Sequence, residues 1–285
     1  MHSAAHWQTT RFCIDLTRPR VMGIVNATPD SFSDGGLHAS ASLAIAHCEQ
    51  LVRDGADLLD IGGESTRPGS QAPGDDGELQ RVLAVLQAAV TMGVPVSVDT
   101  SSARVMAEAL ALGVDIVNDV RALRRPGALA CIAAHPRAGV CLMHMRGEPD
   151  TMQAQAHYGD VLAEVRDFLR ARALEVEAAG VARERIAIDP GIGFAKRPEH
   201  NLLLLQRQAE LCGLGWPLLV GWSRKATLGL VTGRAVGQRT AASVTAALLA
   251  VQRGARVLRV HDVAATVDAL KVWRAVESGM IEGAA

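Results

Sequence analysis

Polar side chains follow short apolar runs at several points of this chain. Asp99, Asn118 and Asp189 stand at or just inside the last position of such runs, where a helix-capping residue would be expected one or two positions later. Any one of them alone is more often a cap or turn residue, but the set is harder to explain in that way. A carboxylate at that depth needs a hydrogen-bond donor, because an unpaired buried charge is strongly destabilising. These side chains are therefore candidate binding groups.

A second group of residues could bind an anion. Arg67 lies in a long connection rich in Gly and Pro, residues 62–77. Arg259 and His261 follow the last apolar run. Guanidinium groups match phosphate oxygens, and free N–H groups at the start of a helix add to such a site. A lone arginine or histidine is as often a solvated surface group, so the prediction requires these segments to meet in space. A second long connection, residues 26–36, is also expected to be functional, as loops of this length usually are.

Eight segments rich in β-branched residues are predicted to be strands, and segments with helical spacing, such as residues 43–51, 79–90 and 160–178, separate them. The predicted strands are Val21–Asn26, Asp57–Ile61, Val94–Asp99, Val114–Asn118, Gly139–His144, Arg185–Asp189, Leu218–Trp222 and Arg256–Val260. Glycines stand where helices should end in a left-handed cap. These are Gly55, Gly93, Gly113, Gly180 and Gly254.

The repeated alternation of apolar strands and helices favours one closed eight-fold β/α (TIM) barrel, with a doubly wound open sheet as the alternative. The chain has 285 residues, which fits one such barrel, and we expect a single domain over residues 1–285. The carboxyl ends of barrel strands form the rim that carries the active site. The segment before Val21, in which Phe12 and Ile14 alternate with polar residues, predicts a short hairpin or strand that closes the barrel floor.

Composition excludes several classes of partner. The formal net charge is only -1, so no basic field would attract nucleic acid or an anionic membrane surface. The apolar stretch at residues 82–98 is interrupted by Gln87, Gly93 and Pro95 and is too broken to span a bilayer. The five cysteines form no CxxC pair, which argues against a zinc knuckle or a disulfide framework. We expect a cytoplasmic protein without a secretory signal.

Together the segments resemble the dihydropteroate synthase family, in order and in spacing, over nearly the whole chain. The matching motifs are residues 22–36 (MGIVNATPDSFSDGG), 60–69 (DIGGESTRPG), 97–100 (SVDT), 116–121 (IVNDVR), 141–145 (CLMHM), 188–194 (IDPGIGF), 221–225 (GWSRK) and 259–263 (RVHDV). The first two are long enough to be highly specific. Ala195, where many relatives have a glycine, and Trp222 depart from the pattern without removing a chemical group.

The resemblance implies a transferase that joins a pterin methyl diphosphate to para-aminobenzoate, with Mg²⁺ as cofactor. The implied pterin contacts are Asp99, Asn118, Met143, Asp189, Lys225 and Arg259, with Asp189 as bidentate acceptor and Arg259 stacked on the ring. Arg67, Arg259 and His261 would stabilise the departing diphosphate, and Asn26 would hold the magnesium ion. The residues implied to border para-aminobenzoate are Thr66, Pro68, Phe194, Ser223 and Lys225.

The resemblance also implies a homodimer, in which residues 241–251 form either a dimer face or, as we favour, an ordinary core helix. Three other functions were weighed. A barrel that binds methyltetrahydrofolate and serves a corrinoid methyl carrier would need the pterin carboxylates but not the two long loops. A metal-dependent hydrolase would need more histidines than His144 and His261, and a core or cap role suits His144 better. A catalytically silent barrel would release no diphosphate.

Overall fold

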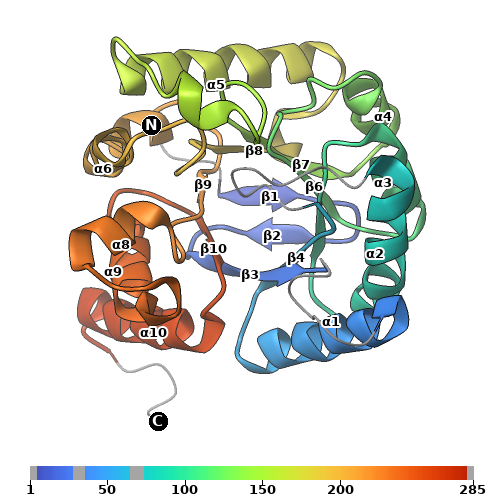
Figure 1. The fold of residues 1–285 in the computed structure, drawn as a ribbon, viewed down its shortest axis with the longest axis horizontal. Coiled ribbons are helices and arrows are strands. Elements are labelled where there is room, and N and C mark those ends of the chain that lie inside the picture. Colours follow the sequence, from blue (N-terminus) through green and yellow to red (C-terminus); the bar gives the residue numbers. More distant parts are fainter. Residues whose placement is uncertain (1–4, 28–35, 65–73, 281–285) are drawn as a thin grey trace.

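The computed structural model describes residues 5–27, 36–64 and 74–280, in which a ring of helices surrounds a sheet of eight strands (Figure 1). The strands are β3 (Arg20–Asn26), β4 (Leu58–Gly62), β5 (Val96–Asp99), β6 (Ile116–Asp119), β7 (Gly139–Met143), β8 (Ile186–Asp189), β9 (Leu219–Val220) and β10 (Val257–Val260). Their order is β8-β7-β6-β5-β4-β3-β10-β9, and all neighbours are parallel. A parallel bridge between Ile188 and Leu218 joins the two outermost strands. The sheet is therefore a closed barrel, as predicted, and not an open sheet.

Helices follow the strands and cover the outside of the barrel. They are α1 (Gly36–Arg53), α2 (Gly74–Ala89), α3 (Ala103–Ala111), α4 (Ala128–Ala134), α5 (Val161–Ala178), α6 (Pro198–Gln206), α7 (Ala209–Cys212), α8 (Ala226–Thr232), α9 (Thr240–Gln252) and α10 (Val263–Ser278), with single 3₁₀ turns at Met152–Gln155, Arg183–Arg185 and Val236–Gln238. Asp160 caps α5, since its carboxylate accepts hydrogen bonds from the N–H groups of Leu162 and Ala163. The five glycines predicted to cap helices all have φ between 79° and 99°, which confirms that prediction. No helix in the described ranges combines the length and the apolar character that a membrane span requires.

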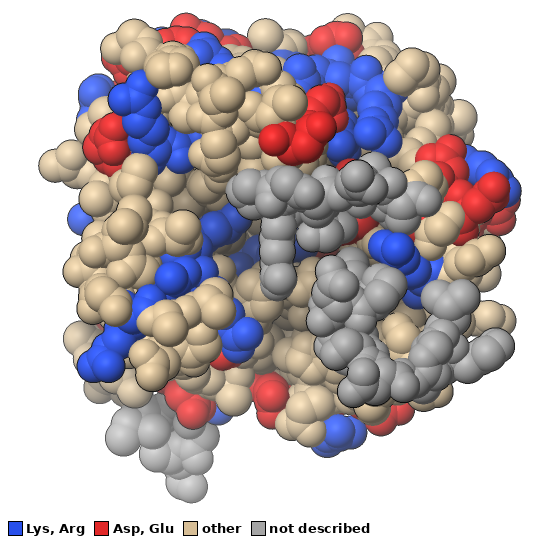
Figure 2. Space-filling view, in the orientation of Figure 1, with Lys and Arg blue, Asp and Glu red and all other residues tan. Residues whose placement is uncertain are grey.

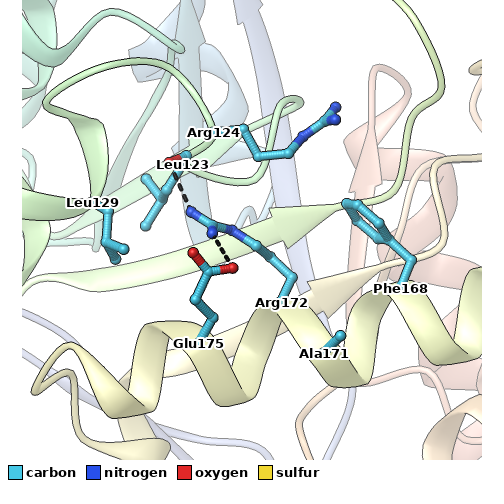
Figure 3. Close-up of a pocket in the computed structure, with 7 residues that line it drawn as sticks. All are labelled: Leu123, Arg124, Leu129, Phe168, Ala171, Arg172 and Glu175. Atoms are coloured by element: carbon cyan, nitrogen blue, oxygen red, sulfur yellow. Dashed lines mark hydrogen bonds and ion pairs between the residues drawn. The ribbon is translucent and has the colours of Figure 1, made fainter.

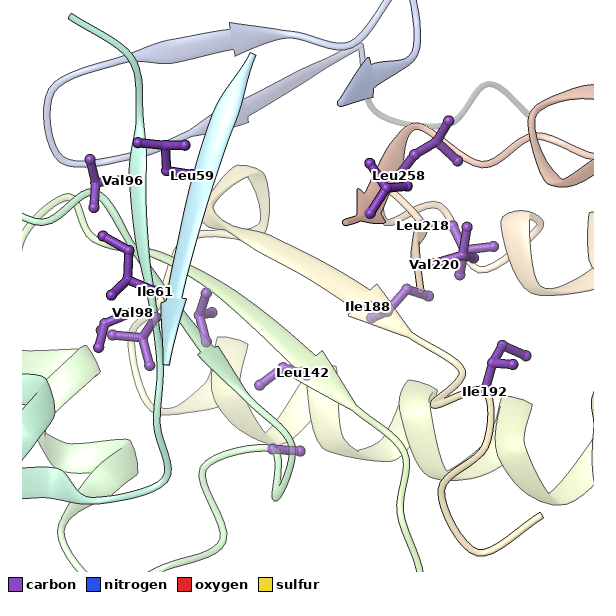
Figure 4. Close-up of a cluster of buried hydrophobic side chains, with 14 of the residues drawn as sticks. Leu59, Ile61, Val96, Val98, Leu142, Ile188, Ile192, Leu218, Val220 and Leu258 are labelled. Atoms are coloured by element: carbon purple, nitrogen blue, oxygen red, sulfur yellow. The ribbon is translucent and has the colours of Figure 1, made fainter. Parts of the chain in front are cut away.

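Alternate strand residues face two different layers. One set packs outwards against the helices, and Figure 4 shows members of it on β4, β5, β7 and β8. The opposite set faces the barrel interior, where its lowest members pack against Trp7, Ile14 and Leu16. These lowest members are Met22, Leu58, Ile116, Cys141, Ala187, Leu219 and Val257.

A hairpin closes the floor of the barrel. Its strands β1 (His6–Gln8) and β2 (Cys13–Asp15) are antiparallel, and they cross the middle of the ring of helices in Figure 1. Trp7 is fully buried, and its indole Nε1 donates to the carbonyl of Arg185, at the start of β8, over 2.9 Å. The predicted hairpin is therefore confirmed, and the interior above it opens towards the carboxyl rim.

Strand β9 is shorter than predicted. The sequence predicted a strand over residues 218–222, but pairing with β10 stops at Val220. The chain then turns, because the N–H of Lys225 donates to the carbonyl of Trp222. Trp222 is 2% exposed and belongs to the outer core, so this departure from the family pattern does not line the interior.

Candidate active site at the carboxyl rim

Higher in the barrel, the inward-facing residues become polar. The strand register places Asp99 level with Asn118, and Met143 level with Asp189. Arg259, on β10, reaches two carboxylates from neighbouring strands: its Nε lies 2.5 Å from Asp60 Oδ2, and its Nη2 lies 2.7 Å from Asp99 Oδ2. The amide of Asn118 donates to the same oxygen of Asp60 over 3.2 Å. Three of the predicted pterin contacts thus form one hydrogen-bonded network.

Asp60 is a site residue that the sequence reasoning missed. Its side chain is fully buried, and its Oδ1 has no hydrogen-bond partner among the described residues. Ser97, which pairs with Asp60 in the strand register, also has a hydroxyl without a partner there. Unsatisfied buried acceptors are costly, so these atoms are suited to a ligand that donates hydrogen bonds. The sequence does carry a signal for Asp60, because it is a charged residue in the middle of the apolar segment LLDIG.

Burial and neighbouring charges shift the pKa values of the groups in this network in opposing directions. Burial raises the pKa of Asp99 to about 7, although the guanidinium of Arg259 opposes the shift. Burial alone would lower the pKa of Arg259, but Asp60 and Asp99 together raise it. Arg259 therefore stays charged and forms an ion pair with Asp60 and with Asp99. Such a site can match a ligand edge that carries both donors and acceptors.

Asp189 and Lys225 lie at the same rim. Burial raises the pKa of Asp189, while the N–H of Gly191, which donates to its Oδ1 over 2.7 Å, opposes that shift. Burial and the charge of Arg259 lower the pKa of Lys225 to about 8. Lys225 Nζ lies 4.4 Å from the ring centroid of Phe194. Phe194 in turn packs with Met143, so the predicted pterin and para-aminobenzoate contacts adjoin.

Ser223 and His261 form a hydrogen-bonded pair. Ser223 Oγ lies 2.9 Å from His261 Nδ1 and accepts the backbone N–H of His261 over 3.1 Å. Burial, together with the charges of Arg224 and Arg259, lowers the pKa of His261 to about 3. His261 is therefore neutral near pH 7, and a neutral imidazole can bind an anion by donating a hydrogen bond. The direction of this bond depends on the imidazole tautomer: in the tautomer whose proton is on Nε2, Ser223 donates to Nδ1.

Some predicted site residues cannot be located. Thr66, Arg67 and Pro68 lie outside the described residues. Asn26 is described as the last residue of β3, partly exposed and level with Gly62. Within the described ranges no group of three or more His, Cys, Asp or Glu residues could hold a metal ion.

His144 has a structural role. It is 3% exposed, and burial and the charge of Lys196 lower its pKa to about 2. Its ring stacks edge-on against Phe168, with 4.9 Å between centroids, and its Nδ1 lies 2.9 Å from Lys196 Nζ. The preference for a core role is confirmed, and Lys196 is a second buried group that the sequence reasoning missed.

Arg121 connects several loops behind the rim. Its guanidinium donates to Ser101 Oγ over 3.0 Å, to Glu148 over 2.6 Å and to Glu64 over 3.3 Å. Asp119 accepts the hydroxyl of Ser101 and the N–H of Arg121. These bonds tie together the segments that follow β4, β5, β6 and β7, so the rim residues are held from outside.

One view shows the face that carries the site, and another shows a cavity elsewhere on the molecule. Figure 2 shows Lys and Arg side chains in a hollow near the centre of the face seen in Figure 1. A separate cavity of about 460 Å³ lies outside the barrel, between α5 and the loop after β6 (Figure 3). There Arg172 is engaged by the carbonyls of Ala122 and Leu123 and by Glu175. This cavity does not contain the polar network of the rim.

Glu78 provides a test of the electrostatics next to the site. It is 3% exposed on α2, its Oε1 has no partner among the described residues, and burial raises its pKa from 4.5 to about 7. The folded state therefore resists ionisation of Glu78, and this penalty is absent below pH 4.5 and complete above about pH 7. We expect Glu78→Gln to gain stability relative to the wild type as pH rises, by about 3 kcal/mol over this interval, since one pKa unit is about 1.4 kcal/mol.

Urea unfolding of both proteins at several pH values measures the effect. Glu49→Gln, on the exposed face of α1, controls for the loss of one carboxylate. A difference between Glu78→Gln and wild type that stays constant with pH would contradict the assignment.

Comparison with known proteins agrees with this geometry. The profile of the family described as "Pterin binding enzyme" matches residues 22–261. Dihydropteroate synthase of Neisseria meningitidis serogroup B is 51% identical over 276 residues, which cover 95% of this chain and 97% of that protein. The structure of Xanthomonas albilineans dihydropteroate synthase with 4-aminobenzoic acid has a TM-score of 0.91 and 50% identity, covering 97% of this chain and 99% of that one. The Burkholderia cenocepacia enzyme complexed with 7,8-dihydropteroate has a TM-score of 0.89 and 46% identity, with 98% and 99% coverage. This chain therefore belongs to the pterin-binding enzymes and, among them, to the dihydropteroate synthase family.

Proposed function

We propose that this chain, as a single barrel domain over residues 1–285, condenses 6-hydroxymethyl-7,8-dihydropterin diphosphate with para-aminobenzoate. The products are 7,8-dihydropteroate and diphosphate. One observation carries the proposal: Arg259 is bonded to Asp60 and Asp99 in the interior, with Asn118, Asp189 and Lys225 beside them. These side chains can bind the hydrogen-bonding edge of a pterin, while the guanidinium of Arg259 faces the departing diphosphate. The dihydropteroate bound by the Burkholderia relative supports this reading.

The pterin ring would lie deepest. Asp189 has one oxygen bonded to Gly191, which leaves Oδ2 to accept from the aminopyrimidinone edge. The unpartnered oxygen of Asp60 would accept a further ring N–H, beside Asp99 and Asn118. Lys225 would donate to the ring carbonyl, and Met143 would pack on the ring.

Catalysis would consist mainly of stabilising the leaving group. The carbon–oxygen bond to diphosphate breaks, and the dihydropterin ring delocalises the positive charge left on the methylene. The amine then attacks as a neutral nucleophile, the carbon–nitrogen bond forms, and one proton passes to solvent. Arg67, Arg259 and His261 would bind the oxygens as charge develops on them, with His261 donating from neutral Nε2.

The described residues are compatible with a magnesium ion held mostly by the substrate. Asn26 offers an amide oxygen at the rim, and no bond from its side chain to another described residue competes for that oxygen. Mg²⁺ commonly takes only one or two protein ligands and completes its shell with phosphates and water. When bound, it would offset the negative charge of the diphosphate.

Para-aminobenzoate would bind above the pterin. Phe194 and Lys225 would flank its ring, and Ser223 would lie towards its carboxylate. Thr66 and Pro68 are assigned to the same subsite from the family motif. The 4-aminobenzoic acid bound by the Xanthomonas relative supports this subsite.

A turnover assay tests the function. Purified protein, incubated with both substrates and Mg²⁺, should release diphosphate and form dihydropteroate in equal amounts. Methyl transfer from methyltetrahydrofolate to a corrinoid, without diphosphate release, would instead favour the alternative function.

We expect para-aminobenzoate to bind well only after the anion site is filled. Thr66 and Pro68 belong to the motif of residues 60–69, which the sequence predicts to be part of a long loop rich in Gly and Pro. Diphosphate bound to Arg67, Arg259 and His261 would order this loop and remove the entropic cost of ordering it from the second ligand. Calorimetry of para-aminobenzoate with and without pterin, diphosphate and Mg²⁺ measures the effect. Equal affinity in the two conditions would show that the subsite is preformed.

We also propose a cytoplasmic homodimer. Leu230 and Val231 on α8 are 71% and 64% exposed, Val236 is 59% exposed, and Leu202 on the neighbouring α6 is 43% exposed. Exposed apolar side chains on helices that are in contact are typical of an interface. Helix α9, by contrast, buries Ala246, Ala247 and Ala250, which suits the core role favoured for residues 241–251. Sedimentation equilibrium of the purified protein tests the dimer.

A further inference from the structure

Lys196 is a buried amine that the proposed reaction does not use, and burial lowers its pKa to about 7. It lies between β8 and α6, is 3% exposed, and its Nζ has four neighbouring acceptors. They are His144 Nδ1 at 2.9 Å, the carbonyls of Gly191 and Phe194 at 3.0 Å each, and the carbonyl of His144 at 3.3 Å. A lysine ammonium has three hydrogens to donate, so its capacity is fully used by backbone and ring acceptors. No carboxylate oxygen is among these four acceptors, so Lys196 is not placed there by an ion pair.

The four acceptors come from two separate segments. His144 follows β7, whereas Gly191 and Phe194 belong to the loop that follows β8. The segments touch closely: Gly191 has φ of 67°, and a Cβ at this position would lie 2.0 Å from the carbonyl oxygen of His144. Ala195, a non-glycine residue, has φ of 49°. A left-handed conformation is unfavourable for alanine, so other contacts must hold the loop in this shape.

The same loop contacts the proposed site at three points. The N–H of Gly191 donates to Asp189 Oδ1 over 2.7 Å. A Cβ at Gly193 would lie 3.2 Å from Cδ of Lys225, so the backbone passes directly beside that side chain. The ring of Phe194 lies 4.4 Å from Lys225 Nζ. Any displacement of the loop therefore moves the groups assigned to para-aminobenzoate.

We infer that Lys196 is a positioning residue, which fixes the loop of residues 190–196 against the end of β7 and so holds Phe194 beside Lys225 for para-aminobenzoate. The inference rests on the proposed function. Lys196 touches neither substrate in this arrangement and acts through Phe194. Of the proposed pterin contacts, Asp99, Asn118 and Arg259 stand on other strands, whereas Asp189 and Lys225 adjoin this loop.

Kinetics of Lys196→Met separate positioning from general stabilisation. The methionine keeps an apolar stem and removes every donor. We expect the KM for para-aminobenzoate to rise about tenfold or more, and the KM for the pterin diphosphate to rise by a clearly smaller factor, because three of its proposed contacts stand on other strands. Lys196→Gln, which keeps a donor on a shorter chain, should show a smaller rise and serves if the methionine variant yields too little folded protein.

Arg185 offers a matched control at the opposite end of the same strand. It is 4% exposed and donates to the carbonyls of Ala138 and Ile132, beside the barrel floor. Arg185→Met should lower the melting temperature and leave both KM values unchanged. If Lys196→Met also lowers the melting temperature and leaves both KM values unchanged, Lys196 is only structural and the inference is wrong.

A double-mutant cycle with Phe194→Ala tests the route of the effect. If Lys196 acts through Phe194, then Lys196→Met should add no further rise in the KM for para-aminobenzoate in the Phe194→Ala background. Equal rises in both backgrounds overturn the inference. Wild-type turnover distinguishes failure of the proposed function from failure of the inference. If the wild type forms no dihydropteroate, the proposed function is wrong and the inference is wrong with it. If the wild type turns over normally but Lys196→Met changes the two KM values equally, only the positioning role of Lys196 is wrong.

Discussion

Asp189→Asn is expected to weaken pterin binding by about 2–4 kcal/mol while the barrel still folds, because a charged acceptor is replaced by a group that itself donates. Asp189 is 6% exposed, and its Oδ1 is already bonded to Gly191. The remaining oxygen would face the ring, and an amide there presents either an unfavourable donor or a weaker acceptor. Isothermal titration with the pterin measures the loss.

Asp115→Asn is the matched control for this substitution. Asp115 is also fully buried, but it lies just before β6, where it binds Arg11 at the amino end of the barrel. Its replacement should lower the free energy of unfolding and leave pterin affinity unchanged. Unchanged affinity in Asp189→Asn would refute the assignment of Asp189 to the pterin.

The second large effect is expected at Arg259. Arg259→Ala should lower kcat by about 100-fold or more, because the diphosphate gains charge only as the carbon–oxygen bond breaks. The Kd of the pterin diphosphate should rise by a smaller factor. His261→Ala should act in the same direction and more weakly, since its ring is neutral. Single-turnover rates and direct binding of the pterin diphosphate give the two quantities.

Arg259 also neutralises two carboxylates, which requires a control. Alanine leaves Asp60 and Asp99 without their guanidinium partner, and removing one partner of a buried pair is destabilising by itself. Arg259→Lys keeps a charge there and should fold better, yet it lacks the fork that binds two groups at once. Arg256→Ala, at the amino end of the same strand, removes an arginine far from the rim. A normal kcat in Arg259→Ala would eliminate its role in catalysis.

Local patterns in the sequence predicted the barrel and placed the candidate site residues at its carboxyl rim. Asp99, Asn118 and Asp189 interrupt apolar strands at their carboxyl ends, and parallel strands bring such ends to one rim. That inference needs only the period of the strand and the topology rule. Both are properties of neighbouring residues, so they can be read without coordinates.

The missed features depend on pairs that are distant in the chain. Asp60 is held by Arg259, 199 positions away, and Lys196 is held by His144, 52 positions away. The neutral state of His261 likewise follows from burial and from charges on other segments. No spacing rule assigns partners over such distances, because they are set by the strand register and by how the loops pack.

The hairpin that closes the barrel floor affects the order in which substrates bind and the product leaves. Trp7, Ile14 and Leu16 fill the amino end of the barrel, so among the described residues the carboxyl rim is the open side for a ligand that binds the polar groups above them. The pterin, assigned to the deeper position, must then arrive before para-aminobenzoate covers it. The product leaves in the opposite order. Its pterin end leaves last and must pass the position where the next para-aminobenzoate would bind. In a barrel that is closed at its floor, the pterin therefore binds first and the pterin end of the product leaves last. An excess of para-aminobenzoate should slow product release, because it would bind at the rim through which the product leaves.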